Sequence, residues 1–416
     1  MKRQDIENSF RLKPLKFPLR DTPHLTIETN RTCNLHCRLC YNIDREFVKT
    51  LDDVKKEIDL ALKKRNLQTV TLLGGEPTLH PELPEIVAYI KNKNLICQLL
   101  TNGLVFLKDE KDALLERLAA SGIDRILLHI DSGQTHVHKD IEEARRALFS
   151  RLEEKKIHFS LSLTLYEEDR KQMGRIIKKY SPYRYFDGIL AVLARDPLAV
   201  GERNGDLLLE YKRLRRELNL DPTAYIPSNL NDDQVSWLIY YYFINAETGK
   251  TLNLSPGLNQ AFRRLYRLAR GRNLFAFKIS PRFQKLTGLL AGVAEVFIQP
   301  KKLPIFLRLL KNPGWTENIR FHFIIIQTAP EFNPEKKRYE MCYHCPDATI
   351  RNGKLTPVCI ADLINPLDGN LNNPLFRPDL YQEAYENLGE FQEGLFQSNV
   401  WPKPGQISQV PPLSLH

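Results

Sequence analysis

The segment Thr32-Cys33-Asn34-Leu35-His36-Cys37-Arg38-Leu39-Cys40-Tyr41 decides the fold, because it places three cysteines within eight residues. Thiolates at Cys33, Cys37 and Cys40 can surround one compact metal centre. Soft sulfur ligands suit an iron–sulfur cluster or zinc. Three protein ligands leave one metal position open, and an open position is where a metal centre does chemistry.

A glycine turn follows this segment at the spacing of a βα unit. The cysteines come just after a strand-like run at residues 24–29, and a second strand-like run at 69–73 opens into Gly74-Gly75-Glu76-Pro77. The alternative is a structural zinc loop beside an unrelated glycine turn. A zinc loop needs a fourth ligand close by, and the nearby candidate His36 lies inside the triplet, where its reach is poor.

A three-cysteine loop with gaps of three and two residues, followed after the next strand by Gly-Gly-Glu-Pro, resembles the radical S-adenosylmethionine (SAM) superfamily. The resemblance implies that Cys33, Cys37 and Cys40 hold a [4Fe–4S] cluster, whose fourth iron takes the amino and carboxylate groups of SAM. One electron, from a flavodoxin- or ferredoxin-type donor, then cleaves the sulfonium C–S bond and leaves methionine and a 5′-deoxyadenosyl radical. That radical removes a hydrogen atom from the substrate, while the protein orients the reactants and excludes water.

The resemblance also implies a SAM contact at the glycine turn. Gly74, Gly75, Glu76 and Pro77 would receive the SAM amino group, with Glu76 accepting hydrogen bonds from it. The alternative is an ordinary strand-to-helix turn with a carboxylate at the helix N-terminus.

Further SAM contacts are expected after later strands. Asp131 and Ser132 end the fourth strand-like run, where polar groups of the superfamily often contact the ribose or methionine part of SAM. Asn102 follows the third run, and both places also fit simple turns. Leu39 stands where the family often has an aromatic residue packed on the adenine. No catalytic residue is assigned.

Strand-like runs alternate with helical patterns between residues 22 and 195, which predicts βαβ units and a parallel sheet. The fold class is therefore α/β, as a partial (β/α)₆ barrel of the superfamily type, with a helical substrate region and a small C-terminal cysteine hairpin. The predicted strands are 25–29, 69–73, 96–101, 125–130, 158–164 and 188–193, and the predicted helices are 51–65, 83–91, 109–120 and 136–154. In α/β barrels the site lies at the C-terminal ends of the strands.

The predicted organisation has five parts: a lead-in at 1–20, the barrel at 21–195, a helical substrate-side region at 196–330, a cysteine module at 331–375 and a tail at 376–416. Helices are expected at 233–245 and 258–272 in the substrate-side region, and a strand at 320–327.

A second cysteine group lies near the C-terminus, at Cys342, Cys345 and Cys359. Asn352-Gly353 between two β-prone runs is a strong hairpin signal, so Cys359 should return toward the other two. The group resembles the first half of the auxiliary-cluster modules of many radical SAM enzymes. It would hold a second iron–sulfur cluster with an unusual fourth ligand (His344, a substrate atom or water), or zinc, or no metal.

Composition places the 416-residue chain among globular proteins, with 42% hydrophobic and 26% charged residues. Seven cysteines, six of them in two tight groups, favour metal binding in a reducing compartment over disulfides. Neither a signal peptide nor a membrane-spanning run is found in the sequence, so we expect a cytoplasmic protein.

The formal charge of +10 is concentrated in one segment. Residues 258–311 contain twelve basic residues and one acid, Glu295, which indicates an anionic partner. On a helical wheel, Leu258, Phe262 and Leu265 share one side of the expected helix 258–272, and arginines share the other. A basic amphipathic helix suits an anionic membrane surface, so we expect peripheral association with one. A normal surface helix is the alternative.

The segment from Arg320 to Cys359 resembles the tetraether-lipid synthase group of radical SAM enzymes, and the aromatic run 237–243 would line a greasy channel. Together they favour a lipid-like substrate and C–C bond formation. The alternatives are peptide modification, tRNA modification and a non-catalytic, metal-stabilised binding protein. Nucleic acid is not an expected partner, because the sequence shows no recognisable RNA-binding module.

Overall fold

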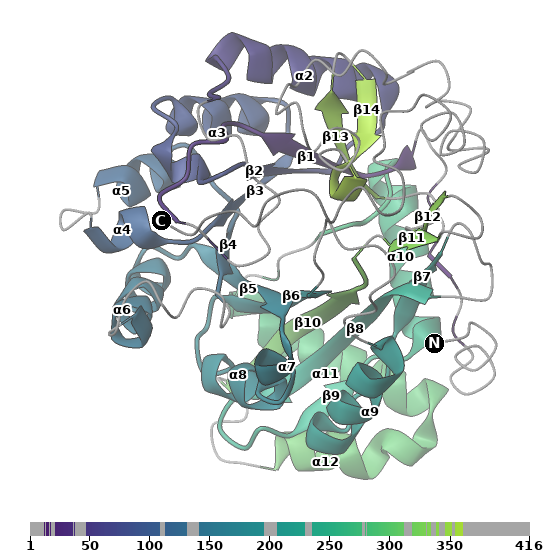
Figure 1. Ribbon diagram of the computed structural model, residues 1–416. Coiled ribbons are helices and arrows are strands. Elements are labelled where there is room, and N and C mark those ends of the chain that lie inside the picture. The colour runs from purple at the N-terminus through teal and green to yellow at the C-terminus, as the bar shows by residue number, and fades with distance from the viewer. Residues whose placement is uncertain are drawn as a thin grey trace.

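The computed structural model describes residues 12, 14–15, 17, 21–35, 37, 47–108, 113–130, 141–194, 206–228, 235–276, 279, 281–311, 318–329, 331–333, 338–340, 346–351 and 354–360. Its centre is one large mixed sheet, curved into an open barrel (Figure 1), whose strands run in the order β14-β13-β1-β2-β3-β4-β5-β6-β10-β8-β7, with β9 paired to β8.

The strands are β1 (His24–Glu28), β2 (Thr69–Leu73), β3 (Ile96–Thr101), β4 (Arg125–His129), β5 (His158–Leu165), β6 (Phe186–Leu193), β7 (Ala224–Pro227), β8 (Val235–Asn245), β9 (Thr251–Asn253), β10 (Ile319–Gln327), β11 (Glu331–Asn333), β12 (Arg338–Glu340), β13 (Asp347–Arg351) and β14 (Lys354–Pro357). The α-helices are α2 (Leu51–Lys64), α3 (Leu83–Asn92), α4 (Leu104–Lys108), α5 (Ala113–Ala120), α6 (Ile141–Glu154), α7 (Glu167–Arg170), α8 (Met173–Tyr180), α9 (Leu207–Leu218), α10 (Pro256–Arg270), α11 (Pro281–Ile298) and α12 (Leu303–Leu310).

The first six strands form the predicted barrel half. β1 to β6 pair in parallel and in chain order, and helices join them. The six predicted strands are confirmed to within two residues at each end. Buried runs of branched side chains explain why the signal was clear, since a parallel strand covered on both faces is apolar along its whole length.

The predicted helix 51–65 is confirmed as α2, which starts where Thr50 Oγ1 accepts a hydrogen bond from the Asp53 N–H. The helix expected at 109–120 is described only as α5, preceded by the separate short α4, and the one expected at 136–154 is described from residue 141. The region 196–330 holds strands β7 to β9 as well as helices, and the strand expected at 320–327 is confirmed as β10.

The helix predicted at 233–245 is wrong, because residues 235–245 form β8, the longest strand of the sheet. All eleven side chains of β8 are buried. A strand covered on both faces has no alternation of polar and apolar residues. Nine of the eleven residues of β8 are apolar, and a run of eleven has the length of a helix, so the pattern misled the assignment. Trp237, Tyr240 and Phe243 are buried core residues of this strand.

The C-terminal hairpin is confirmed. β13 and β14 pair antiparallel around residues 351 and 354, and β13 adds to the sheet by running parallel to β1. Among the described residues the sheet is not closed by strand pairing. The helix α10 lies at the N-terminal ends of β1 and β2, where Arg267 forms an ion pair of 2.7 Å with Asp21 and Tyr266 Oη accepts a 2.8 Å hydrogen bond from Gln68.

A buried ion cluster ties the strands together inside the barrel. The Arg125 guanidinium of β4 lies 2.7 Å from the Asp187 carboxylate of β6, and His158 Nδ1 of β5 lies 2.8 Å from the other Asp187 oxygen. All three side chains are almost fully buried. Burial by itself would raise the pKa of Asp187, but Arg125 and His158 outweigh it and lower that pKa below its usual value.

We predict that Asp187→Ala costs roughly 3–5 kcal/mol of unfolding free energy, because it leaves a buried guanidinium without its partner. The matched control, Glu85→Ala, removes the half-exposed partner of Arg117 and should cost less than about 1 kcal/mol. Urea unfolding measures both. A carboxyl with a lowered folded-state pKa stabilises above its unfolded pKa, so stability of the wild type should fall as the pH drops below about 4. Equal losses for the two variants would contradict the cluster's role.

Candidate functional site

The cysteine loop begins and ends at the C-terminal end of β1. Its first residues pair with its last: the Arg31 N–H donates to Phe47 O at 2.6 Å, and the Lys49 N–H donates to Thr29 O at 2.9 Å. Cys33 and Cys37 lie on this loop, and both are partly exposed. Cys40 and Leu39 lie outside the described residues. The thiols that are described therefore sit where an α/β barrel carries its site.

The Gly74-Gly75 turn docks against the backbone of this loop. The Gly75 N–H donates to Asn30 O at 2.7 Å, and the Glu76 N–H donates to Thr32 O at 2.8 Å. A Cβ on Gly74 would lie 2.1 Å from Asn30 O, and one on Gly75 would lie 2.2 Å from Arg31 O. Only glycine allows two backbones to come so close. The glycines therefore fix the path of the chain into Cys33.

Asn30 fills the junction between the two backbones. Its side chain is buried, and its Nδ2 donates to Thr32 O at 2.9 Å and to Glu76 O at 3.0 Å, while its Oδ1 accepts from Thr29 Oγ1 at 2.7 Å. The sequence analysis missed this residue. Its signal was the same as that of Asn102: a polar residue placed directly after a strand-like run.

Glu76 is turned into the protein. Its carboxylate is buried and accepts hydrogen bonds from Thr101 Oγ1 at 2.6 Å, from the Asn102 N–H at 2.8 Å and from the Thr78 N–H at 3.0 Å. Burial raises the pKa of Glu76, and these donors act in the opposite direction. The Glu76 side chain thus joins the ends of β2 and β3, and Pro77 starts the following turn of 3₁₀-helix, Pro77–Leu79.

Asn102 completes the link to the cysteine loop. Its Nδ2 donates to Asn34 Oδ1 at 2.8 Å, and its Oδ1 accepts from the Leu104 N–H at 2.9 Å. The structure therefore brings together the loop of Cys33, the turn Gly74 to Pro77 and Asn102, as the sequence predicted. Asp131 and Ser132 follow β4 but lie outside the described residues.

Cys359 lies at the other end of the barrel. Pro357 pairs with Ala348, and Ala348 pairs with Leu25 near the start of β1, so the hairpin returns to the N-terminal end of that strand. Cys359 is exposed there, and Cys342 and Cys345 lie outside the described residues. Because β1 is five residues long, about 16 Å of strand separate its N-terminal end, to which the hairpin of Cys359 returns, from its C-terminal end, where the loop of Cys33 begins. Cys97 is buried in β3, and burial raises the pKa of its thiol, so it is an inert core residue.

No three His, Cys, Asp or Glu side chains converge on a metal-sized site within the part of the chain that the structure describes. The predicted sets Cys33–Cys37–Cys40 and Cys342–Cys345–Cys359 each include cysteines beyond that part. The donor chemistry nevertheless fits a cluster at the first set, because two partly exposed thiols stand on a loop that buried hydrogen bonds hold in place.

Comparison with known proteins identifies the domain. The model of the radical SAM superfamily matches residues 27–180. Residues 27–180 therefore form a radical SAM domain. The matched region covers β1 to α8, and therefore the cysteine loop, the glycine turn and Asn102.

The curated relatives match only part of the chain. A probable GTP 3′,8-cyclase of Methanococcus aeolicus is 31% identical over 150 residues, which is 34% of this chain and 48% of that protein. A tungsten-containing aldehyde ferredoxin oxidoreductase cofactor-modifying protein of Pyrococcus furiosus is 30% identical over 112 residues, 26% of this chain and 30% of that protein. The chain spans less than half the length of these curated relatives.

Among solved structures, SuiB of Streptococcus suis bound to S-adenosylmethionine covers 51% of this chain and 49% of its own, with 17% identity and a TM-score of 0.40. A likeness at this level supports no argument about substrate.

Gly75→Ala tests the docking of the two backbones. We expect a loss of iron per reconstituted chain and a fall of roughly 2 kcal/mol or more in unfolding free energy, because the new methyl group meets backbone atoms that cannot move aside. Gly257→Ala is the matched control, since a Cβ there meets nothing within 4 Å. Iron retained at the wild-type level in Gly75→Ala would show that the turn does not hold the loop.

Glu76→Gln tests the buried carboxylate. The amide nitrogen would face hydrogen-bond donors, so we expect a loss of roughly 1–3 kcal/mol in unfolding free energy. The exposed Glu82, on the same connection, gives the control Glu82→Gln, which should be neutral. Thermal unfolding of the two variants separates them, and equal stability would mean that the Glu76 oxygens are not needed as acceptors.

Proposed function

We propose that Cys33, Cys37 and Cys40 hold a [4Fe–4S] cluster, and that the chain uses SAM to remove a hydrogen atom from its substrate. The observation that carries this proposal is the docking of Gly74 and Gly75 on the loop of Cys33 at the C-terminal end of β1. A bound cluster would supply the electron that splits the sulfonium of SAM. A flavodoxin- or ferredoxin-type protein is the proposed source of that electron.

The residues of the chain would orient and shield the reactants. The backbone at Gly74 and Gly75 is the proposed contact for the SAM amino group, together with Pro77 at the turn. The Glu76 oxygens already accept hydrogen bonds from three protein residues. We therefore propose that Glu76 positions this backbone in addition to any contact that it makes with the SAM ammonium group. Asn102, Asp131, Ser132 and Leu39 are proposed to complete the SAM pocket.

For the substrate we propose a lipid-like molecule that is attacked at an unactivated carbon, with C–C bond formation as the outcome. The support comes from residues 256–311, where three helices present large apolar side chains to solvent in a strongly basic segment. We propose further that Cys342, Cys345 and Cys359 hold a second iron–sulfur cluster.

Anaerobic reconstitution tests the metal assignment. We expect about eight irons per chain in the wild type, about four in Cys359→Ser, and 5′-deoxyadenosine formation from SAM only while the first group is intact. Cys33→Ser should lose that activity, and the control Cys97→Ala should keep both its iron and its activity. A wild type with about four irons per chain would contradict the second cluster. Formation of 5′-deoxyadenosine by Cys33→Ser would contradict the cluster at Cys33, Cys37 and Cys40.

Comparison of the lipids and peptides of cells with and without this gene tests the substrate class. A lipid whose tails are joined only when the gene is present would support the proposal. A modified peptide in place of such a lipid would contradict it.

A further inference from the structure

The helix α11 has an apolar outer face. Its outer side carries a stripe with alternating spacings of three and four residues: Phe283, Leu286, Leu290, Val293 and Phe297. The exposed fractions of these side chains run from 41% at Val293 to 83% at Phe297. A surface helix normally turns polar residues outward, so this stripe indicates a partner.

The opposite side of α11 is already packed. A Cβ on Gly288 would lie 2.9 Å from Ile319, the first residue of β10, and one on Gly292 would lie 2.0 Å from the Phe306 ring of α12. The stripe is therefore not the face by which α11 packs on the sheet. It is a second apolar face, opposite the one on which Gly288 and Gly292 pack against β10 and α12.

The helix α10 likewise exposes apolar side chains and buries polar ones. It buries polar groups: Asn259 is buried, and Arg263 donates to Tyr241 Oη at 3.1 Å and to Leu274 O at 2.6 Å. It exposes Leu265 by 65% and Leu268 by 83%. These apolar side chains of α10 therefore face solvent, unlike those of an ordinary surface helix.

The helix α12 continues this surface, with Leu303 exposed by 44% and Leu307 by 52%. Contacts of α11 with both α10 and α12 make the three helices neighbours. We call their large exposed apolar side chains, together with the stripe, the outer face: Phe262, Leu265, Leu268, Phe283, Leu286, Leu290, Val293, Phe297, Ile298, Leu303 and Leu307.

Cations surround the outer face. Exposed basic residues of the same helices and their connections include Arg264, Arg270, Lys301 and Lys311. The single acid of residues 256–311, Glu295, is fully buried and bound to Lys302 at 2.6 Å. An outer face with apolar side chains, many cations and no exposed acid complements an anionic, apolar partner.

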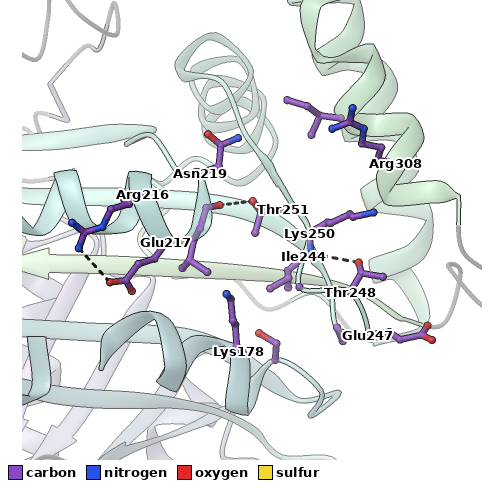
Figure 2. A pocket seen from close by; sticks show the side chains of 15 residues that line it. Lys178, Arg216, Glu217, Asn219, Ile244, Glu247, Thr248, Lys250, Thr251 and Arg308 are labelled. Carbon is purple, nitrogen blue, oxygen red and sulfur yellow. Dashed lines mark hydrogen bonds and ion pairs between the residues drawn. The ribbon is translucent and has the colours of Figure 1, made fainter. Parts of the chain in front are cut away.

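A basic cavity adjoins α12 (Figure 2). It has a volume of about 530 Å³ and lies between α8, α9, the turn from β8 to β9, and α12. Four cations line it, Lys178, Arg216, Lys250 and Arg308, against two carboxylates. Arg216 lies 4.0 Å from Glu217, whereas no carboxylate among the described residues lies within ion-pair distance of Lys178, Lys250 or Arg308. Arg308 follows Leu307 of the outer face, so a phosphate-bearing headgroup could bind here beside an inserted surface.

We propose that the outer face docks on an anionic lipid bilayer, with a lipid phosphate in the cavity beside Arg308. A second copy of this chain is disfavoured, because its equally basic outer face would bring like charges together. Shallow insertion of Phe and Leu side chains framed by Arg and Lys is the mode of peripheral membrane helices. No described helix is long and apolar enough to cross a membrane. The inference rests on the lipid-like substrate proposed above, and it names the outer face as the surface that binds the membrane in which such a substrate would lie.

The placement of the outer face sets the orientation. α10 contacts Asp21 and Gln68, which precede β1 and β2, and α11 contacts Ile319 at the start of β10. These are the N-terminal ends of parallel strands, whereas the cysteine loop leaves the C-terminal end of β1. Docking would therefore turn the cysteine loop away from the bilayer, and the outer face holds the protein at the membrane rather than delivering the reacting carbon directly.

Vesicle co-sedimentation of the full chain tests this inference. The wild type should bind vesicles containing roughly one-third phosphatidylglycerol at low salt, and bind pure phosphatidylcholine at least about tenfold more weakly. The double variant Leu290→Asp/Phe297→Asp should lose about tenfold or more in binding. Its control is Leu209→Asp, which changes an exposed leucine of α9 outside the outer face.

Charge reversal provides a second arm. Arg264→Glu/Arg270→Glu should weaken binding to the anionic vesicles, whereas Lys63→Glu/Lys64→Glu on the exposed end of α2 should not. Arg308→Gln should weaken vesicle binding, while titration with inorganic phosphate distinguishes a free anion from a lipid headgroup. Tighter binding of phosphate than of the vesicles would contradict the headgroup assignment.

Three outcomes would overturn the inference: no binding of the wild type to anionic vesicles, equal binding by the Leu290/Phe297 variant, or a dimer by light scattering that this variant dissociates. Formation of 5′-deoxyadenosine separates this test from that of the proposed function. Vesicle binding without turnover would refute the radical chemistry alone, and turnover without vesicle binding would refute the docking alone.

Discussion

Close contact between two backbone segments is the constraint on which the site depends. The turn at Gly74 and Gly75 lies so near residues 30–32 that no side chain fits between them. This contact sets the direction in which the chain leaves β1 and enters the cysteine loop. Asn30 and Glu76 then lock the contact with buried hydrogen bonds, and Asn102 adds an exposed one to Asn34, so the loop is held by strands β1, β2 and β3 together. The sheet would therefore hold the ligands of a metal centre on this loop in a fixed geometry.

The two ends of the barrel differ in chemistry. The C-terminal ends of the strands carry thiols and a hydrogen-bonded turn, as expected for a catalytic face. The N-terminal ends are covered by α10 and α11, which bury polar groups against the sheet and present Leu and Phe to solvent. Because the cysteine loop and the outer face lie at opposite ends of the barrel, the protein can be held at a surface without blocking access to its site.

The sequence predicted the barrel half and the position of the site, because local signals specify them. Parallel strands are short apolar runs, and Gly74-Gly75 permits a backbone approach that other residues forbid. It failed at β8, where burial on both faces removes the periodicity that distinguishes strand from helix. It identified the apolar and basic sides of α10 but left open which of them the sheet buries, because a helical wheel does not show the side that the sheet selects. Asn30 was missed since its role depends on a partner 46 residues away, Glu76.

The most direct test of the central claim is electron paramagnetic resonance of the anaerobically reconstituted, dithionite-reduced chain before and after addition of SAM. The account predicts a [4Fe–4S] signal that is changed by SAM in the wild type and in Cys359→Ser, and that shows no such change in Cys33→Ser. A wild-type spectrum without a cubane signal, or one that SAM leaves unaltered, would contradict the claim that the cysteine loop on its glycine turn holds a SAM-binding cluster.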